Sequence, residues 1–207
     1  MPPHPLRRKA LARWARTDPT LHALAKRTPA PERALAGGTP FEALVESIAH
    51  QQVSIHAGRS IFARVRALGC TPAGLVAAGP DALRAAGLSR PKASYVLDLA
   101  QKAASGELDL DALAELPDEE VVAQLTRVKG IGVWTAKMFL LFHLDRPDVL
   151  PHEDLGLQLA VSDAYGVPRE KAAKTMLRLA PAWSPYASYA ALVLWNARRV
   201  AMEERPR

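Results

Sequence analysis

The 207-residue sequence predicts an all-α fold, and three observations lead to this prediction. Apolar residues recur at helical spacing, as in Phe41, Leu44, Val45 and Ile48, which occupy positions i, i+3, i+4 and i+7. Glycine or proline stands at nearly every junction between such segments. No segment alternates apolar and polar residues as a half-buried strand does.

The predicted helices follow one another with few residues between them. The first covers 6–16, and the second, which contains Phe41, begins at Thr39-Pro40, a pair typical of a helix start. The other predicted helices lie at 54–68, 80–86, 90–104, 118–128, 133–143, 154–165, 168–179 and 184–202. The junctions carry Gly37-Gly38, Gly69, Gly79-Pro80, Gly87, Gly106, Pro117, Pro147, Pro151, Gly166 and Pro168. The segment from Pro147 to Pro151 is the best candidate for an internal boundary between subdomains.

The composition excludes several classes of protein. Hydrophobic residues make up 49% of the chain and charged residues 23%, which is typical of a folded globular protein. No apolar run approaches the roughly 18 residues of a membrane span, and the basic N-terminus lacks the apolar segment of a secretory signal. A single cysteine, Cys70, excludes an intrachain disulfide and a cysteine-ligated cluster. We therefore expect a cytoplasmic protein with no membrane partner.

The charge is unevenly distributed. The chain has a formal net charge of +6, and residues 1–34 contain eight lysines and arginines against Asp18 and Glu32. Residues 105–126 contain seven acidic residues and no basic one. Such a distribution favours a positive face that binds a polyanion, although a basic chain without a functional meaning is an equal alternative on charge alone.

The strongest local motif is the segment from Leu125 to Ala136, LTRVKGIGVWTA. Gly130 and Gly132 permit positive φ and the close approach of another group to the backbone, while Ile131 between them can fill the space between two helices. The amides that follow lie at a helix N-terminus, which attracts phosphate. The segment thus predicts a phosphate-binding helical hairpin rather than a plain turn between helices.

This hairpin, followed by LPHEDLGLQLA, resembles the helix-hairpin-helix DNA glycosylase superfamily, in particular its 3-methyladenine DNA glycosylase II branch. The segments PFEALVESIAHQQVS, GLSRPKASYVLDLA and WSPYASYAALVLWNA resemble the same branch, in the same order. The resemblance implies one glycosylase unit over 1–207, with an active-site cleft between two helical subdomains. One subdomain would cover about 40–145, including the hairpin at 125–137, and the other about 1–39 plus 146–207.

The resemblance implies that Asp154 is the catalytic residue. An aspartate at a helix N-terminus is also a common N-cap, and the two roles are compatible, since the helix dipole keeps the carboxylate ionised. An ionised carboxylate stabilises the positive charge that develops on deoxyribose when an N-glycosidic bond breaks. Glu153 is the nearest alternative. A metal site at His152-Glu153-Asp154 is rejected, because three adjacent residues on a helix cannot all face one ion.

Trp134 occupies the position at which backbone-cutting relatives carry a Schiff-base lysine, so the resemblance implies no AP-lyase activity. Trp134, Trp195, Met138 and Gln51 are expected to line the base pocket, although Trp134 could also be a core residue. Electron-rich rings attract N3- or N7-alkylated purines, which are cationic.

Gln52 is expected to fill the gap that the extruded nucleotide leaves, with an ordinary polar helix end as the alternative. DNA phosphates are expected to contact residues of the hairpin and of the helix start near 90, namely Lys129, Gly130, Gly132, Val133, Lys137, Ser89 and Lys92.

The sequence therefore predicts a monofunctional glycosylase of base excision repair that removes 3-methyladenine and 7-methylguanine from DNA. It is expected to need no cofactor and to act as a monomer without an obligate protein partner. The alternatives are a glycosylase for hypoxanthine or ethenoadenine, and a non-catalytic DNA-binding protein that uses the hairpin alone.

Overall fold

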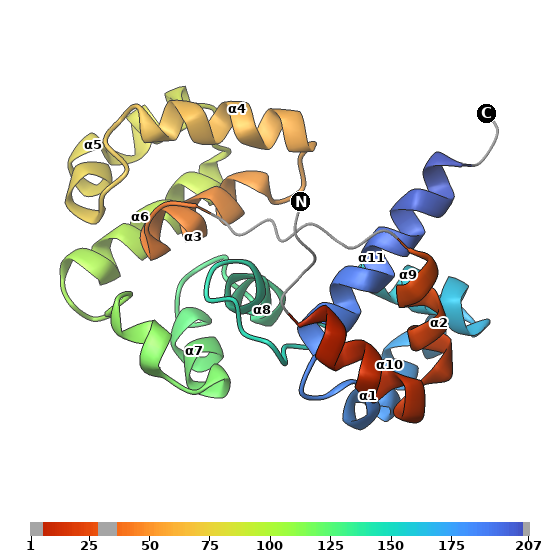
Figure 1. The fold of residues 1–207 in the computed structure, drawn as a ribbon. Coiled ribbons are helices and arrows are strands. Elements are labelled where there is room, and N and C mark those ends of the chain that lie inside the picture. Colours follow the sequence, from red (N-terminus) through yellow and green to blue (C-terminus); the bar gives the residue numbers. More distant parts are fainter. Residues whose placement is uncertain (1–5, 29–36, 205–207) are drawn as a thin grey trace. The chain divides into compact units, whose positions relative to one another are not determined.

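A computed structural model describes residues 6–28 and 37–204 of the chain. These residues form eleven α-helices and one short 3-10 helix, and the described part contains no strand (Figure 1). The all-α prediction is confirmed. None of the described helices is long and apolar enough to cross a membrane. The chain divides into two compact units, which we call the hairpin unit (Leu35–Leu144) and the terminal unit (Met1–Ala34 with Asp145–Arg207).

The hairpin unit contains seven helical elements. They are α3 (Pro40–His50), α4 (Ile55–Arg66), α5 (Pro72–Ala85), α6 (Arg90–Ala104), η1 (Ala112–Glu115), α7 (Asp118–Leu125) and α8 (Val133–Phe142). Three of them begin alike: the hydroxyls of Thr39, Thr71 and Ser89 accept a backbone N–H three residues on, and a proline follows within the first turn. The largest fully buried side chains of this unit are aliphatic, namely Leu44, Ile48, Leu75, Leu83, Leu99, Leu113, Leu125 and Leu140.

The terminal unit contains α1 (Arg7–Thr17), α2 (Pro19–Arg27), α9 (Leu155–Tyr165), α10 (Arg169–Trp183) and α11 (Ala187–Glu203). Its core includes Trp14 and Tyr189, whose rings stack with centroids 5.6 Å apart. Buried Asp18 joins three elements of this unit. Its carboxylate accepts hydrogen bonds from the Leu21 amide (2.9 Å), the Tyr165 hydroxyl (2.6 Å) and the Trp183 indole (2.8 Å).

The structure corrects several predicted boundaries. Helix α2 was not predicted, because the single residue Asp18 separates it from α1. The helix predicted at 80–86 is the second part of α5, which begins at Pro72 and kinks at Gly79 (φ +73°). Helix α10 continues beyond 179 to Trp183 with Pro181 inside its last turn, and α7 ends at Leu125 instead of at 128.

Candidate functional site

The predicted hairpin joins α7 to α8, with Gly132 as the N-cap of α8. Gly130 has a φ of +78°, and a Cβ at this position would lie only 2.1 Å from Cδ2 of Tyr95 on α6. Position 130 therefore requires glycine for two reasons: its positive φ and its close contact with the Tyr95 ring. Ile131 is 3% exposed and fills the space inside the turn, whereas Gly130, Gly132 and Val133 are exposed.

Two side chains outside the hairpin hold its turn in place. Asp98 of α6 accepts the backbone N–H of Lys129 at 2.9 Å, and its other oxygen lies 3.8 Å from the Lys129 ammonium. Gln51, at the end of α3, donates its amide to the carbonyl of Gly130 at 2.9 Å. The Lys129 amide is thus engaged inside the protein, as is the Ile131 amide, which donates to the carbonyl of Val128 at 3.1 Å. Phosphate contacts of the other hairpin amides stay a prediction. Lys137 and Met138 are half-buried on α8.

The two other predicted phosphate ligands have partners within the hairpin unit. Ser89 is the N-cap of α6, and its hydroxyl accepts the Lys92 amide. The Lys92 ammonium donates to the carbonyl of Ala49 at 2.9 Å, and burial lowers the pKa of Lys92. Lys92 therefore fixes the end of α3 to the start of α6. A phosphate contact of either residue stays a prediction.

The corner after α3 has an unusual backbone. Gln52, the predicted wedge, is exposed and has a φ of +56°, a conformation that few residues other than glycine adopt. Two apolar residues beside it, Val53 and Ile55, are 39% and 65% exposed. Neither residue was predicted from the sequence as part of the site. The sequence feature that could have identified Val53 and Ile55 as exposed is that both are apolar, stand at a helix start and fall outside the helical periodicity of the core residues.

In the terminal unit, the structure brings together Asp154 and Trp195, which lie 41 residues apart. Asp154 is the N-cap of α9, and its Oδ1 accepts hydrogen bonds from the Leu157 amide at 2.6 Å and the Trp195 indole at 2.9 Å. Gly156 lies next to this pair. A Cβ on Gly156 would be 3.2 Å from Asp154 Oδ1 and 3.5 Å from Trp195 Nε1, so a side chain there would press on both groups. The neighbouring Glu153 is 3.5 Å from His152 Nε2.

The loop that leads to Asp154 is fixed to the start of α11. The Ser188 hydroxyl donates to the carbonyl of Arg146 at 2.6 Å and accepts the Val149 amide at 2.9 Å. Asp148 accepts the Ser184 hydroxyl at 2.6 Å and the Ala187 amide at 3.0 Å. Asp148 was not selected from the sequence, because its partners lie about 40 residues away. These contacts orient the loop from which the Asp154 side chain projects.

This arrangement suits the stabilisation of positive charge. A carboxylate held at a helix N-terminus by an amide and an indole N–H is oriented before any reaction begins, and such preorganisation is a large term in catalysis. Trp134, Met138, Gln51 and Gln52 belong to the hairpin unit, and Asp154 and Trp195 to the terminal unit. Among the described residues, no cluster of three or more metal-ligating side chains occurs.

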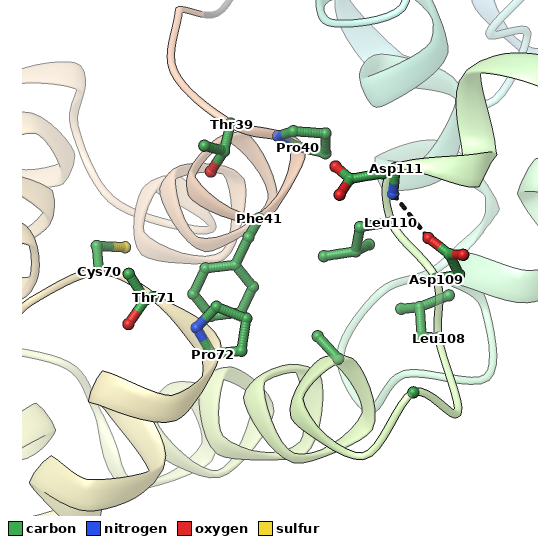
Figure 2. A pocket seen from close by; sticks show the side chains of 12 residues that line it. Thr39, Pro40, Phe41, Cys70, Thr71, Pro72, Leu108, Asp109, Leu110 and Asp111 are labelled. Carbon is green, nitrogen blue, oxygen red and sulfur yellow. Dashed lines mark hydrogen bonds between the residues drawn. The ribbon is translucent and has the colours of Figure 1, made fainter.

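A separate hollow of about 390 Å³ opens in the hairpin unit between the starts of α3 and α5 and the loop after α6 (Figure 2). Figure 2 shows Cys70 on one side and Asp109 and Asp111 on the other. Burial is the largest cause that raises the pKa of Cys70 to about 11, with Glu42 adding to the effect. The thiol therefore stays protonated at neutral pH and is a poor nucleophile. None of the predicted site residues lines this hollow.

Comparison with known proteins gives consistent results. YfjP of Bacillus subtilis is 33% identical over 167 residues, which cover 76% of this chain and 58% of that protein. The DNA-3-methyladenine glycosidase of Bacillus halodurans has a similar structure, with a TM-score of 0.84, 34% identity, and coverage of 97% of this chain and 92% of that one. The 3-methyladenine DNA glycosylase Mag1 of Schizosaccharomyces pombe, in complex with abasic DNA, gives a TM-score of 0.76, 28% identity, and coverage of 90% and 95%.

The model of the HhH-GPD superfamily of base excision DNA repair proteins matches residues 45–185, more than half of the chain. The match includes the hairpin, Asp98 that supports it and the Asp154 loop, and the resemblance found in the sequence is confirmed. This chain belongs to the HhH-GPD superfamily of base excision DNA repair proteins.

Proposed function

We propose that this protein is a monofunctional DNA glycosylase that hydrolyses the N-glycosidic bond of alkylated purines, 3-methyladenine and 7-methylguanine, after their extrusion from DNA. The observation that carries the proposal is the hydrogen-bonded pair of Asp154 and Trp195 above Gly156. The names of the similar solved structures support the substrate class. A protein that only bound DNA through the hairpin would have no use for a carboxylate oriented in this way.

In the proposed mechanism, the bond between the base and C1′ lengthens and positive charge develops on the sugar. The Asp154 carboxylate stabilises this charge and helps to position the attacking water. The Leu157 amide and the Trp195 indole hold the carboxylate, so little reorganisation is needed when the charge appears. The alkylated base already carries positive charge and leaves as a neutral molecule.

The hairpin unit supplies DNA binding and base capture. The exposed Gly130, Gly132 and Val133 lie where backbone amides meet phosphate, and exposed Gln52 fills the gap in the duplex. Trp134, 40% exposed, offers a ring for stacking. Because a tryptophan occupies the Schiff-base position, the product is an intact strand with an abasic site. We further propose that the protein acts as a monomer in the cytoplasm.

The variant Asp154→Asn tests the catalytic role. Asparagine keeps an oxygen that accepts the Leu157 and Trp195 hydrogen bonds, so folding and DNA affinity should be unchanged. Excision of 3-methyladenine should fall by about 100- to 1,000-fold, the usual effect of removing one group that stabilises the transition state. Glu153→Gln is the matched control. Full activity in Asp154→Asn with a loss in Glu153→Gln would assign the role to Glu153.

Two further measurements test the finer parts of the proposal. Borohydride should trap no covalent adduct between protein and DNA, and a trapped adduct would contradict a purely hydrolytic reaction. Gln52→Ala should impair excision from duplex DNA more than from single-stranded DNA, where no gap opens. Equal losses on the two substrates would exclude Gln52 as the wedge.

A further inference from the structure

We propose that a hollow between α3 and α8 receives the alkylated base and that the Glu46 carboxylate in its wall selects bases that carry a positive charge. The inference rests on the proposed function and deepens it, because it names a residue that distinguishes one class of damaged base from another. The hollow lies within the hairpin unit and has a volume of about 180 Å³. We call it the α3–α8 hollow.

The size and lining of the α3–α8 hollow match one flat aromatic ring system. A cavity of about 150 Å³ accepts a benzene-sized molecule, so this volume accommodates a base but not a whole nucleotide. Met138 and Phe142 line it from α8, and a thioether and an aromatic ring both make favourable contacts with flat rings. Met138 lies one helical turn after Trp134, so the hollow lies on the helix face of the predicted stacking residue.

The α3 side of the hollow is polar and rigid. Glu46, Ser47 and His50 line it, and the His50 ring is fixed in two ways. Its Nδ1 bonds to the carbonyl of Glu46 at 2.9 Å, and its Cδ2 edge packs on Gly58, where a Cβ would be only 2.2 Å away. A wall fixed in this way holds its shape when no ligand is bound.

Glu46 gives the hollow its charge. The side chain is half-buried, and among the described residues its carboxylate forms neither an ion pair nor a hydrogen bond. By contrast, Glu42, one turn earlier, is engaged by Arg66 at 3.3 Å and by the Thr39 amide. A negative charge beside apolar rings attracts a flat cation and gives no such advantage to a neutral base. Purines alkylated at N3 or N7 in DNA are flat cations, whereas hypoxanthine and ethenoadenine are neutral.

Binding of model compounds tests the hollow without catalysis. At pH 6, where its N1 keeps its proton, 7,9-dimethylguaninium carries the positive charge of an alkylated nucleotide, and 9-methylguanine is its neutral counterpart. In the full-length protein labelled with ¹³C at the methionine methyl groups, four signals are expected, and Met138→Leu identifies that of Met138. The Met138 signal should shift with 7,9-dimethylguaninium more than with 9-methylguanine. Glu46→Gln should remove this difference, whereas Glu119→Gln, an exposed carboxylate on α7, should keep it.

Excision assays give the second test. Glu46→Gln should lower kcat/KM for 7-methylguanine about two- to fivefold and leave excision of neutral bases unchanged. A Met138 signal that does not respond to the cation, or that responds equally in Glu46→Gln, would overturn the inference. An equal loss on charged and neutral bases would overturn it as well. If the wild type binds the cation at Met138 but excises no base, the α3–α8 hollow stands and the proposed glycosylase activity falls.

Discussion

Replacement of Gly130 by alanine tests whether the hairpin depends on its contact with α6. A non-glycine residue in the left-handed region costs about 1–2 kcal/mol, and Gly130 has a φ of +78°. The added methyl group would also lie 2.1–2.6 Å from three ring carbons of Tyr95, so the ring must move. Forcing an extra methyl into a packed site costs about 1–3 kcal/mol. The free energy of unfolding should therefore fall by about 2–5 kcal/mol.

Urea denaturation of a double-mutant cycle separates the two effects. In a Tyr95→Ala background the steric cost disappears, so Gly130→Ala should then cost only about 1–2 kcal/mol. Gly132→Ala is the control: its φ is −92° and a Cβ there meets no atom within 4 Å, so the loss should stay below about 1 kcal/mol. Gly130→Ala should also weaken DNA binding. Equal stability losses for Gly130→Ala and Gly132→Ala would refute this account of the turn.

Three other predictions concern the remaining features of the two units. Asp18→Ala should lower the free energy of unfolding by about 2–4 kcal/mol in urea denaturation, because a helix cap is lost and the buried Trp183 indole and half-buried Tyr165 hydroxyl lose their acceptor. Since Cys70 has a pKa of about 11, its alkylation rate should rise about tenfold per pH unit from pH 8 to 10; a plateau near pH 9 would contradict the burial argument. Gly156→Ala should stabilise α9 by about 1 kcal/mol through its higher helix propensity. It should also slow excision, since the methyl group would lie 3.2 Å from Asp154 Oδ1. An unchanged rate with raised stability would show that Gly156 does not position Asp154.

The sequence predicted those features that depend on neighbouring residues. The hairpin glycines, the Thr39-Pro40 helix start and the Asp154 cap follow from local backbone chemistry, and the structure contains each of them. Helix α2 was missed because the single residue Asp18 separates it from α1, although Asp18-Pro19 is itself a local helix-start signal.

Contacts between side chains that lie far apart in the sequence could not be predicted from local sequence patterns. The indole of Trp195 was expected to serve as a stacking surface, and its N–H bond to Asp154 spans 41 residues. Lys92 was expected to contact phosphate from its place at a helix start, but its ammonium reaches a carbonyl 43 residues earlier in the chain. Neither contact leaves a periodic signal, because each joins one side chain to a distant position.

The Asp98 carboxylate is a counterion within the protein that Lys129 shares with Lys102, whose ammonium lies 3.3 Å from Asp98 Oδ1. Its oxygens lie 2.9 Å from the Lys129 amide and 3.8 Å from the ammonium, and its side chain is only 12% exposed. When a DNA phosphate approaches the ammonium, it competes with a carboxylate that is covalently part of the protein and cannot diffuse away. Phosphate binding releases cations condensed on the DNA, and the nearby Asp98 carboxylate offsets part of the positive charge with which Lys129 would displace them. If the turn binds phosphate as proposed, Lys129 should therefore add less than one full charge to the salt dependence of DNA binding.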